Sequence, residues 1–86
     1  MRELLIQKVE LSKINDEYHV NIFVSLEGTS HEVNMIRSES NSMCRPGKSF
    51  PLAIERSLFP KHLALIARKA VDGMLPKLPI SIQTEC

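Results

Sequence analysis

The stretch from residue 18 to residue 36 alternates apolar and polar side chains, and this period of two limits what the chain can fold into. Up to the first glycine its apolar residues, with the exception of Phe23, share one parity: Tyr18, Val20, Ile22, Val24 and Leu26. Such alternation is typical of β-strands that turn one face toward a core. Leu5, Val9 and Leu11 form an earlier row of the same kind. The sequence therefore predicts neighbouring strands that share a buried face.

The turn between these rows sets the first register. Asn15-Asp16 suits a two-residue hairpin loop of type I′, because both residues tolerate a positive φ. Partners then have numbers that sum to 31: Leu11 with Val20, Val9 with Ile22, Leu5 with Leu26, and the polar Gln7 with Val24. A slip of one residue would turn the apolar set to the wrong face, so this agreement supports the register.

A second hairpin follows in the same way. Gly28-Thr29 suits a type II′ turn, whose first central position favours glycine. This turn pairs Glu27 with Ser30, Val24 with Val33, and Ile22 with Met35. Residues 4–38 are therefore predicted to form a three-stranded antiparallel meander with the second strand in the centre.

The second half of the chain predicts helices and one last strand. Residues 38–48 are polar and contain Pro-Gly, so we expect a mobile loop. Residues 50–59 fit a short helix, with Ser49 as cap and Pro51 in the first turn, or a strand. A longer helix should begin at Pro60 and end at Gly73. Its apolar stripe recurs at helical spacing: Leu63, Ile66, Ala67, Ala70, Val71 and Met74.

Alternation of Leu78, Ile80 and Ile82 predicts a short strand at a sheet edge, since prolines precede it. The fold class is thus α+β, a single domain over residues 1–86 with element order βββαβ. If the helix crosses one sheet face, the last strand should run parallel to the first or the third. Placed beside the first, it gives the order 3-2-1-4, which resembles the opening half of a ribonuclease H-like fold in topology alone.

Composition is that of an ordinary soluble domain, with 43% hydrophobic and 24% charged residues. Cys44 and Cys86 do not suggest a disulfide framework, so we expect reduced thiols. The N-terminal residues lack the sustained apolar run of a secretory signal, and no stretch approaches the roughly 20 apolar residues that span a bilayer. These features favour a cytoplasmic protein without a membrane partner.

Catalytic motifs are missing from the sequence. The histidines and cysteines do not occur at zinc-ligand spacing, the serines lie in no nucleophile elbow, and the three glycines form no phosphate-binding loop. A nuclease of the ribonuclease H type would need clustered carboxylates, and Glu10 alone lies near the middle of the first strand. We therefore predict a protein that is not an enzyme and has no metal, cofactor or small-molecule ligand.

Protein binding, with a homodimer as one form, is the function that the sequence favours. In the predicted register Ile6, Phe23 and Ile36 lie together on the outer face of the meander. Such a patch is either a contact surface or is covered by the apolar segment 50–59. Leu65, among basic residues on the outer side of the long helix, is a second candidate, and the last edge strand a third.

Nucleic-acid binding is the alternative. Residues 1–35 contain three basic and six acidic side chains, whereas residues 36–79 contain eight basic and three acidic ones. The basic half offers phosphate contacts from the loop and the helix: Arg45, Lys48, Lys61, Arg68 and Lys69. Only 5% of residues are aromatic and no nucleic-acid-binding motif is present, so two complementary charged faces of one fold explain the asymmetry more simply.

Overall fold

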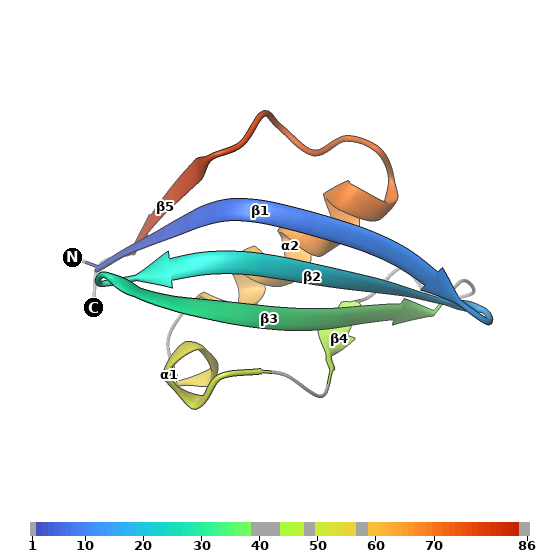
Figure 1. The fold of residues 1–86 in the computed structure, drawn as a ribbon, viewed down its shortest axis with the longest axis horizontal. Coiled ribbons are helices and arrows are strands. Elements are labelled where there is room, and N and C mark those ends of the chain that lie inside the picture. Colours follow the sequence, from blue (N-terminus) through green and yellow to red (C-terminus); the bar gives the residue numbers. More distant parts are fainter. Residues whose placement is uncertain (1, 39–43, 48–49, 57–58, 85–86) are drawn as a thin grey trace.

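The protein folds into one antiparallel sheet with both helices on one side (Figure 1). The computed structural model describes residues 2–38, 44–47, 50–56 and 59–84. In chain order the elements are β1 (Arg2–Ile14), β2 (Glu17–Leu26), β3 (Thr29–Ser38), β4 (Cys44–Pro46), α1 (Leu52–Glu55), α2 (Pro60–Val71) and β5 (Ile80–Thr84). The strand order is β4-β3-β2-β1-β5. The α+β class and the opening meander are thus confirmed.

The first hairpin has the predicted loop and, over most of its length, the predicted register. Partners from Ile14 with Glu17 to Lys8 with Phe23 have numbers that sum to 31. Asn15 has a φ of 56°, but no positive φ occurs at Asp16, so the turn is not the predicted type I′.

A β-bulge breaks this register at Gln7. The pairing skips this residue, so that Ile6 lies opposite Val24 and Leu4 opposite Leu26. Leu4 and Ile6 therefore turn to the core with no exposed surface, while Gln7 is exposed. The predicted pair of Leu5 with Leu26 and the outward position of Ile6 are both wrong, because one extra residue exchanges the two faces of a strand.

The second hairpin turns one residue earlier than predicted. Its loop is Glu27-Gly28, with φ values of 51° and 83°, which fits a type I′ turn. The register consequently shifts by two residues, to pairs such as Ile22 with Val33. A shift of two keeps every side chain on its predicted face and changes only its cross-strand neighbours.

The predicted loop 38–48 contains a strand. β4 pairs antiparallel with the end of β3, from Met35 with Pro46 to Arg37 with Cys44, while residues 39–43 and 48 lie outside the described residues. β4 runs antiparallel to β3. Helix α2 then runs in the direction of β1 and β3, and β5 runs in the opposite direction (Figure 1). β5 is thus antiparallel to β1, not parallel, although it lies beside β1 at the edge as predicted. The resemblance to a ribonuclease H-like topology is therefore lost.

Helix α2 begins and ends where the sequence predicts. Pro60 occupies the first turn, and Gly73 follows the helix with a φ of 71°. The Gly73 N–H donates to the carbonyl of Ala70 at 3.3 Å and the Met74 N–H to that of Lys69 at 2.8 Å, which is a Schellman motif. Met74 thus lies beyond the helix and is 72% exposed, so its predicted place in the apolar stripe is wrong.

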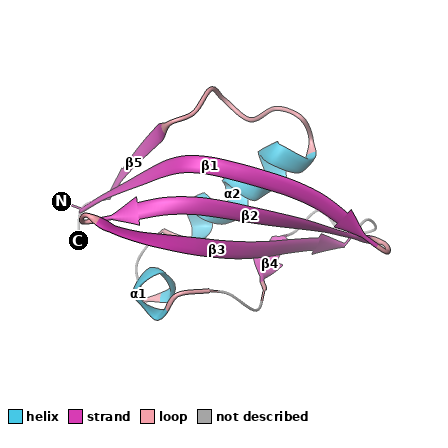
Figure 2. Ribbon diagram, viewed as in Figure 1, coloured by secondary structure: helices cyan, strands magenta, loops and turns pink. Residues whose placement is uncertain are grey.

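The described residues of segment 50–59 pack into the same core as α2, and α1 lies near the β3 edge of the sheet (Figure 2). It contains the predicted short helix, α1, but Pro51 is the N-cap residue and does not lie in the first turn, so the predicted start of this helix is wrong; Ser49 lies outside the described residues. Ile54 and Phe59 are fully buried in the core between the helices and the sheet. The segment therefore does not cover the outer sheet face, which was one of the two predicted alternatives.

Gly47 joins β4 to β3 at a position where a larger residue does not fit. Its N–H donates to the carbonyl of Asn34 at 2.7 Å, and the Asn34 amide donates to the side chain of Asn21 at 2.7 Å. A Cβ on residue 47 would overlap the side-chain amide of Asn34. The glycine thus allows β4 to approach the Asn34–Asn21 pair.

Gly47→Ala is therefore expected to lower the free energy of unfolding by about 1 kcal/mol, because Asn34 must rotate and lose its bond to Asn21. Urea unfolding would measure this cost. In an Asn34→Ala background the same change should cost much less, since the overlapping amide is gone. Equal costs in the two backgrounds would contradict the overlap as the cause.

Candidate functional site

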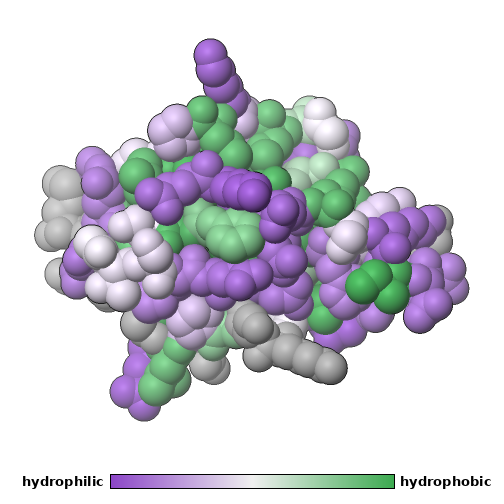
Figure 3. All heavy atoms as spheres, viewed as in Figure 1, coloured by the Kyte–Doolittle hydropathy of each residue, from purple (hydrophilic) through white to green (hydrophobic). Residues whose placement is uncertain are grey.

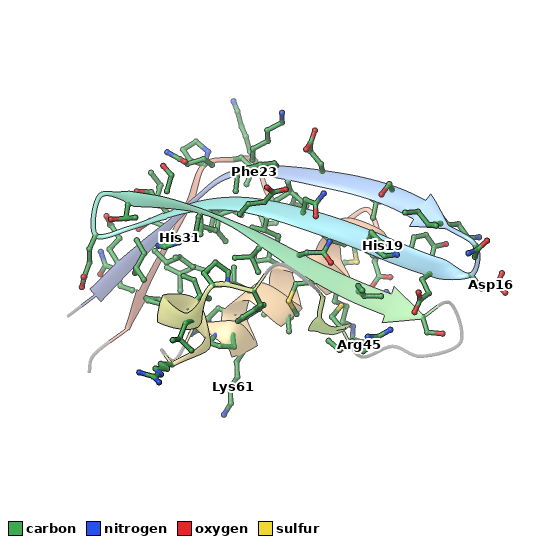
Figure 4. The ribbon with its side chains drawn as sticks, turned by 60° about the horizontal axis from the view of Figure 1, so that its bottom comes forward. Asp16, His19, Phe23, His31, Arg45 and Lys61 are labelled. Atoms are coloured by element: carbon green, nitrogen blue, oxygen red, sulfur yellow. The ribbon has the colours of Figure 1, made fainter. Side chains whose placement is uncertain are left out.

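The outer sheet face carries one aromatic side chain among polar ones. Phe23 is half-buried, points away from the helices (Figure 4), and has the Lys8 ammonium 5.6 Å from its ring centroid. Lys8 also lies 3.5 Å from the Glu10 carboxylate. Figure 3 views this face and shows hydrophilic side chains around a small hydrophobic centre. Phe23 is thus already partnered by a cation within the fold.

The three-residue patch predicted here does not exist. Ile6 is in the core, and Ile36 is only 9% exposed. Ile36 lies opposite His19 on one side and Arg45 on the other, and Phe23 lies opposite Glu32. The bulge at Gln7 and the shifted second hairpin account for the difference, because together they replace the apolar neighbours of Phe23 by polar ones.

Leu65 lies where the sequence predicts, on the side of α2 that faces away from the sheet. It is 49% exposed. Lys61 and Arg68, four residues before it and three after it, are exposed as well and share its helical face. A large apolar side chain therefore lies between two cations on the same surface.

The short helix α1 repeats this arrangement. Leu52 is 58% exposed, and Arg56, four residues later, is also exposed. We call the set of five exposed residues on the two helices the helix face: Leu52, Arg56, Lys61, Leu65 and Arg68. Leu52 and Arg56 were not among the predicted site residues, although their spacing of four, read as a helix, was the signal that could have found them.

The predicted phosphate-binding residues do not form one stripe. Arg45 comes from β4 and lies 2.9 Å from the Glu17 carboxylate on the outer side of the sheet, while Lys61 points away from the sheet (Figure 4). Lys48 lies outside the described residues. Arg68 and the half-buried Lys69 do follow Lys61 along α2. The basic candidates are thus divided between the two sides of the molecule.

Charge nevertheless differs between the two sides. Among the described residues, the outer sheet face has four carboxylates and two cations: Glu3, Glu10, Glu17 and Glu32, with Lys8 and Arg45. On the helices, Asp72 is neutralised by Arg37 at 3.0 Å, which leaves the cations of the helix face in excess among the described side chains. The asymmetry of the sequence therefore becomes an acidic sheet side and a basic helix side.

Cys44 is a half-buried thiol next to the core. Burial raises its pKa, and the nearby Arg37 and Arg68 guanidinium groups oppose that rise without reversing it. Because the thiolate is the reactive form, this environment does not activate the side chain as a nucleophile.

Within the described ranges, no three His, Cys, Asp or Glu side chains come together in a way that would hold a metal ion. In the same part of the chain, none of the helices has the length and apolar character needed to cross a bilayer. No family model, curated protein or solved structure matches the chain.

Proposed function

We propose that this protein is a non-catalytic module that binds an acidic, partly apolar protein surface through its helix face. The observation that supports this most directly is the exposure of Leu52 and Leu65, each within one turn of a cation. An exposed leucine alone is ordinary on a protein surface. Two of them, set among the three cations of the helix face, match a partner that offers both carboxylates and apolar side chains.

The expected energies favour a modest affinity. Burying the remaining exposed half of a leucine contributes about 1 kcal/mol, and surface ion pairs add at most about 1 kcal/mol each. These gains must exceed the entropy lost on association, so we expect dissociation constants in about the micromolar to millimolar range. Cations around the leucines would mainly orient the partner and increase the association rate.

Nucleic-acid binding is the competing function, and the same cations support it: Arg56, Lys61, Arg68 and Lys69. The two functions differ in what they require of the leucines. Phosphate contacts depend on charge and salt, and they gain little from an aliphatic side chain. Truncating Leu52 and Leu65 therefore separates the two.

The test is a titration of the 15N-labelled protein with three probes, followed by NMR. The first probe is a helical peptide of glutamates and leucines, the second has serine for each leucine, and the third is a DNA duplex of equal charge. We expect the first to bind best, with shifts at Leu52 and Leu65. Replacing both leucines by alanine should weaken that binding about tenfold, which corresponds to about 1.4 kcal/mol.

Met74→Ala serves as the matched control, because Met74 is an exposed apolar residue outside the helix face. Its binding should equal that of the wild type. If the duplex binds more tightly than the leucine peptide, and the leucine variants bind it normally, the function is nucleic-acid binding. If all three probes leave the spectrum unchanged, the helix face is not a binding surface.

A further inference from the structure

Strand β1 is longer than the strand that protects its outer edge. β5 pairs with Arg2–Ile6 only, whereas β1 continues to Ile14. Beyond Ile6, β2 lies on one side of β1, and the described chain places no strand on the other (Figure 1). The segment 74–79 passes on this side with Leu75 and Leu78 packed against the core. The stretch Lys8–Ile14, which we call the open edge, can therefore accept another strand.

The hairpin geometry shows which backbone groups face outward. In a two-residue hairpin the residues that flank the loop, here Ile14 and Glu17, form a hydrogen-bonded pair. Every second residue of β1 before Ile14 then bonds to β2, and the residues between them turn N–H and C=O to the other side. Val9 and Leu11 thus present backbone donors and acceptors to the open edge.

We propose that a second copy of this chain pairs antiparallel with the open edge, about a two-fold axis at Leu11. The two sheets form one continuous sheet, so paired residues must lie on the same face and their numbers must sum to an even value. If the numbers of paired residues sum to 22, Lys8 pairs with Ile14 of the second copy, and Leu11 pairs with Leu11 of the second copy. This pairing fills the whole open edge and ends before the position that β5 occupies.

Side-chain pairs favour the same register. Leu11 is 47% exposed on the helix side of the sheet and would cover its own counterpart. Glu10 would face Ser12. A sum of 20 would instead place Glu10 opposite Glu10, and directly opposed like charges destabilise a strand pair. A sum of 24 would place Leu11 opposite Lys13 and lose the leucine contact.

The opposite side of the sheet lacks these properties. β4 pairs only with the end of β3, so the beginning of β3 is also an edge, but its exposed residues are Thr29, Ser30 and Glu32, and none of them is a leucine that could face its counterpart as Leu11 does. Pairing through β1 alone gives a closed two-fold dimer and not a fibre.

Cysteine cross-linking tests the register directly. In a Cys44→Ser, Cys86→Ser background, Leu11→Cys should form a disulfide-linked dimer under mild oxidation, because the two Cα atoms would lie about 5.5 Å apart. Glu10→Cys alone should not cross-link. A mixture of Glu10→Cys with Ser12→Cys should give the mixed dimer. Cross-linking of Glu10→Cys to itself, with Leu11→Cys unlinked, would overturn the proposed register.

Light scattering tests the dimer without a covalent bond. The wild type should show twice the monomer mass at high concentration, and Leu11→Lys should raise the dissociation constant at least about tenfold, since two cations would then be opposed. Leu65→Lys, an equally exposed leucine on α2, is the control and should leave the dimer intact. A wild type that stays monomeric at the highest soluble concentration would overturn the proposal and would leave the helix face unaffected.

Discussion

Replacing Ile6 by serine is expected to destabilise the fold by about 4 kcal/mol, a large part of the about 5 to 10 kcal/mol that stabilises a small domain. Ile6 has no exposed surface and lies opposite Val24 in the core. The change removes apolar contacts, leaves a cavity, and buries a hydroxyl that needs a hydrogen-bond partner. Urea unfolding followed by circular dichroism would measure the loss.

Phe23→Ser is the matched comparison. The sequence predicts both Phe23 and Ile6 on the outer face of the meander, whereas the structure places Ile6 in the core and leaves Phe23 on the outer face. Phe23 is half-buried, and its loss removes part of its contact area and the Lys8 contact. We expect a cost of about 1 to 2 kcal/mol and a folded protein. A Phe23 variant less stable than the Ile6 variant would contradict the placement of Ile6 in the core and of Phe23 on the outer face.

Phe59→Ala should have an effect of similar size, about 3 to 5 kcal/mol. Its ring is fully buried beside α2, with the ring of His62 at a centroid distance of 6.3 Å, and it joins the core between the helices and the sheet. Phe59 also accepts the Leu63 N–H at 2.9 Å through its backbone, which alanine retains. The expected loss therefore reports packing alone, measured as a shift in the midpoint of thermal unfolding.

Leu65→Ala provides the control for this second change. It removes a similar apolar side chain from the exposed side of α2 and should cost less than about 0.5 kcal/mol. Comparable losses for Phe59→Ala and Leu65→Ala would mean that the segment before α2 does not pack into the core as described.

Predictions from the sequence succeed where a pattern extends over many residues. The alternation from Tyr18 to Leu26 predicts the central strand, because the pattern repeats over nine residues. The ends of α2 are predicted by two independent features, Pro60 in its first turn and Gly73 after its last. The errors are local. Gln7, the one polar residue in an apolar row, was the sign of the bulge, yet an alternating pattern cannot show that a strand contains an extra residue.

Other errors arise from tertiary context. Gly28 suits either the first or the second position of a two-residue hairpin loop, and in the structure it takes the second. The first position is then Glu27, which has a positive φ that non-glycine residues adopt rarely. β4 has three residues, too few for alternation to appear, and its return along β3 reverses the direction of β5. Among site residues, Leu65 could be predicted because its helix was clear, whereas Leu52 depended on a segment with two interpretations.

The placement of both helices on one side of the sheet has a consequence for affinity. A two-fold axis through Leu11, perpendicular to the sheet, would carry the helix layer of each copy to the same side of the joined sheet. The helix faces of both copies would then contact one extended partner. Once the first helix face has bound, the second would bind the same partner at a high effective concentration. Weak individual contacts could thus give durable binding only when the partner repeats its acidic segment.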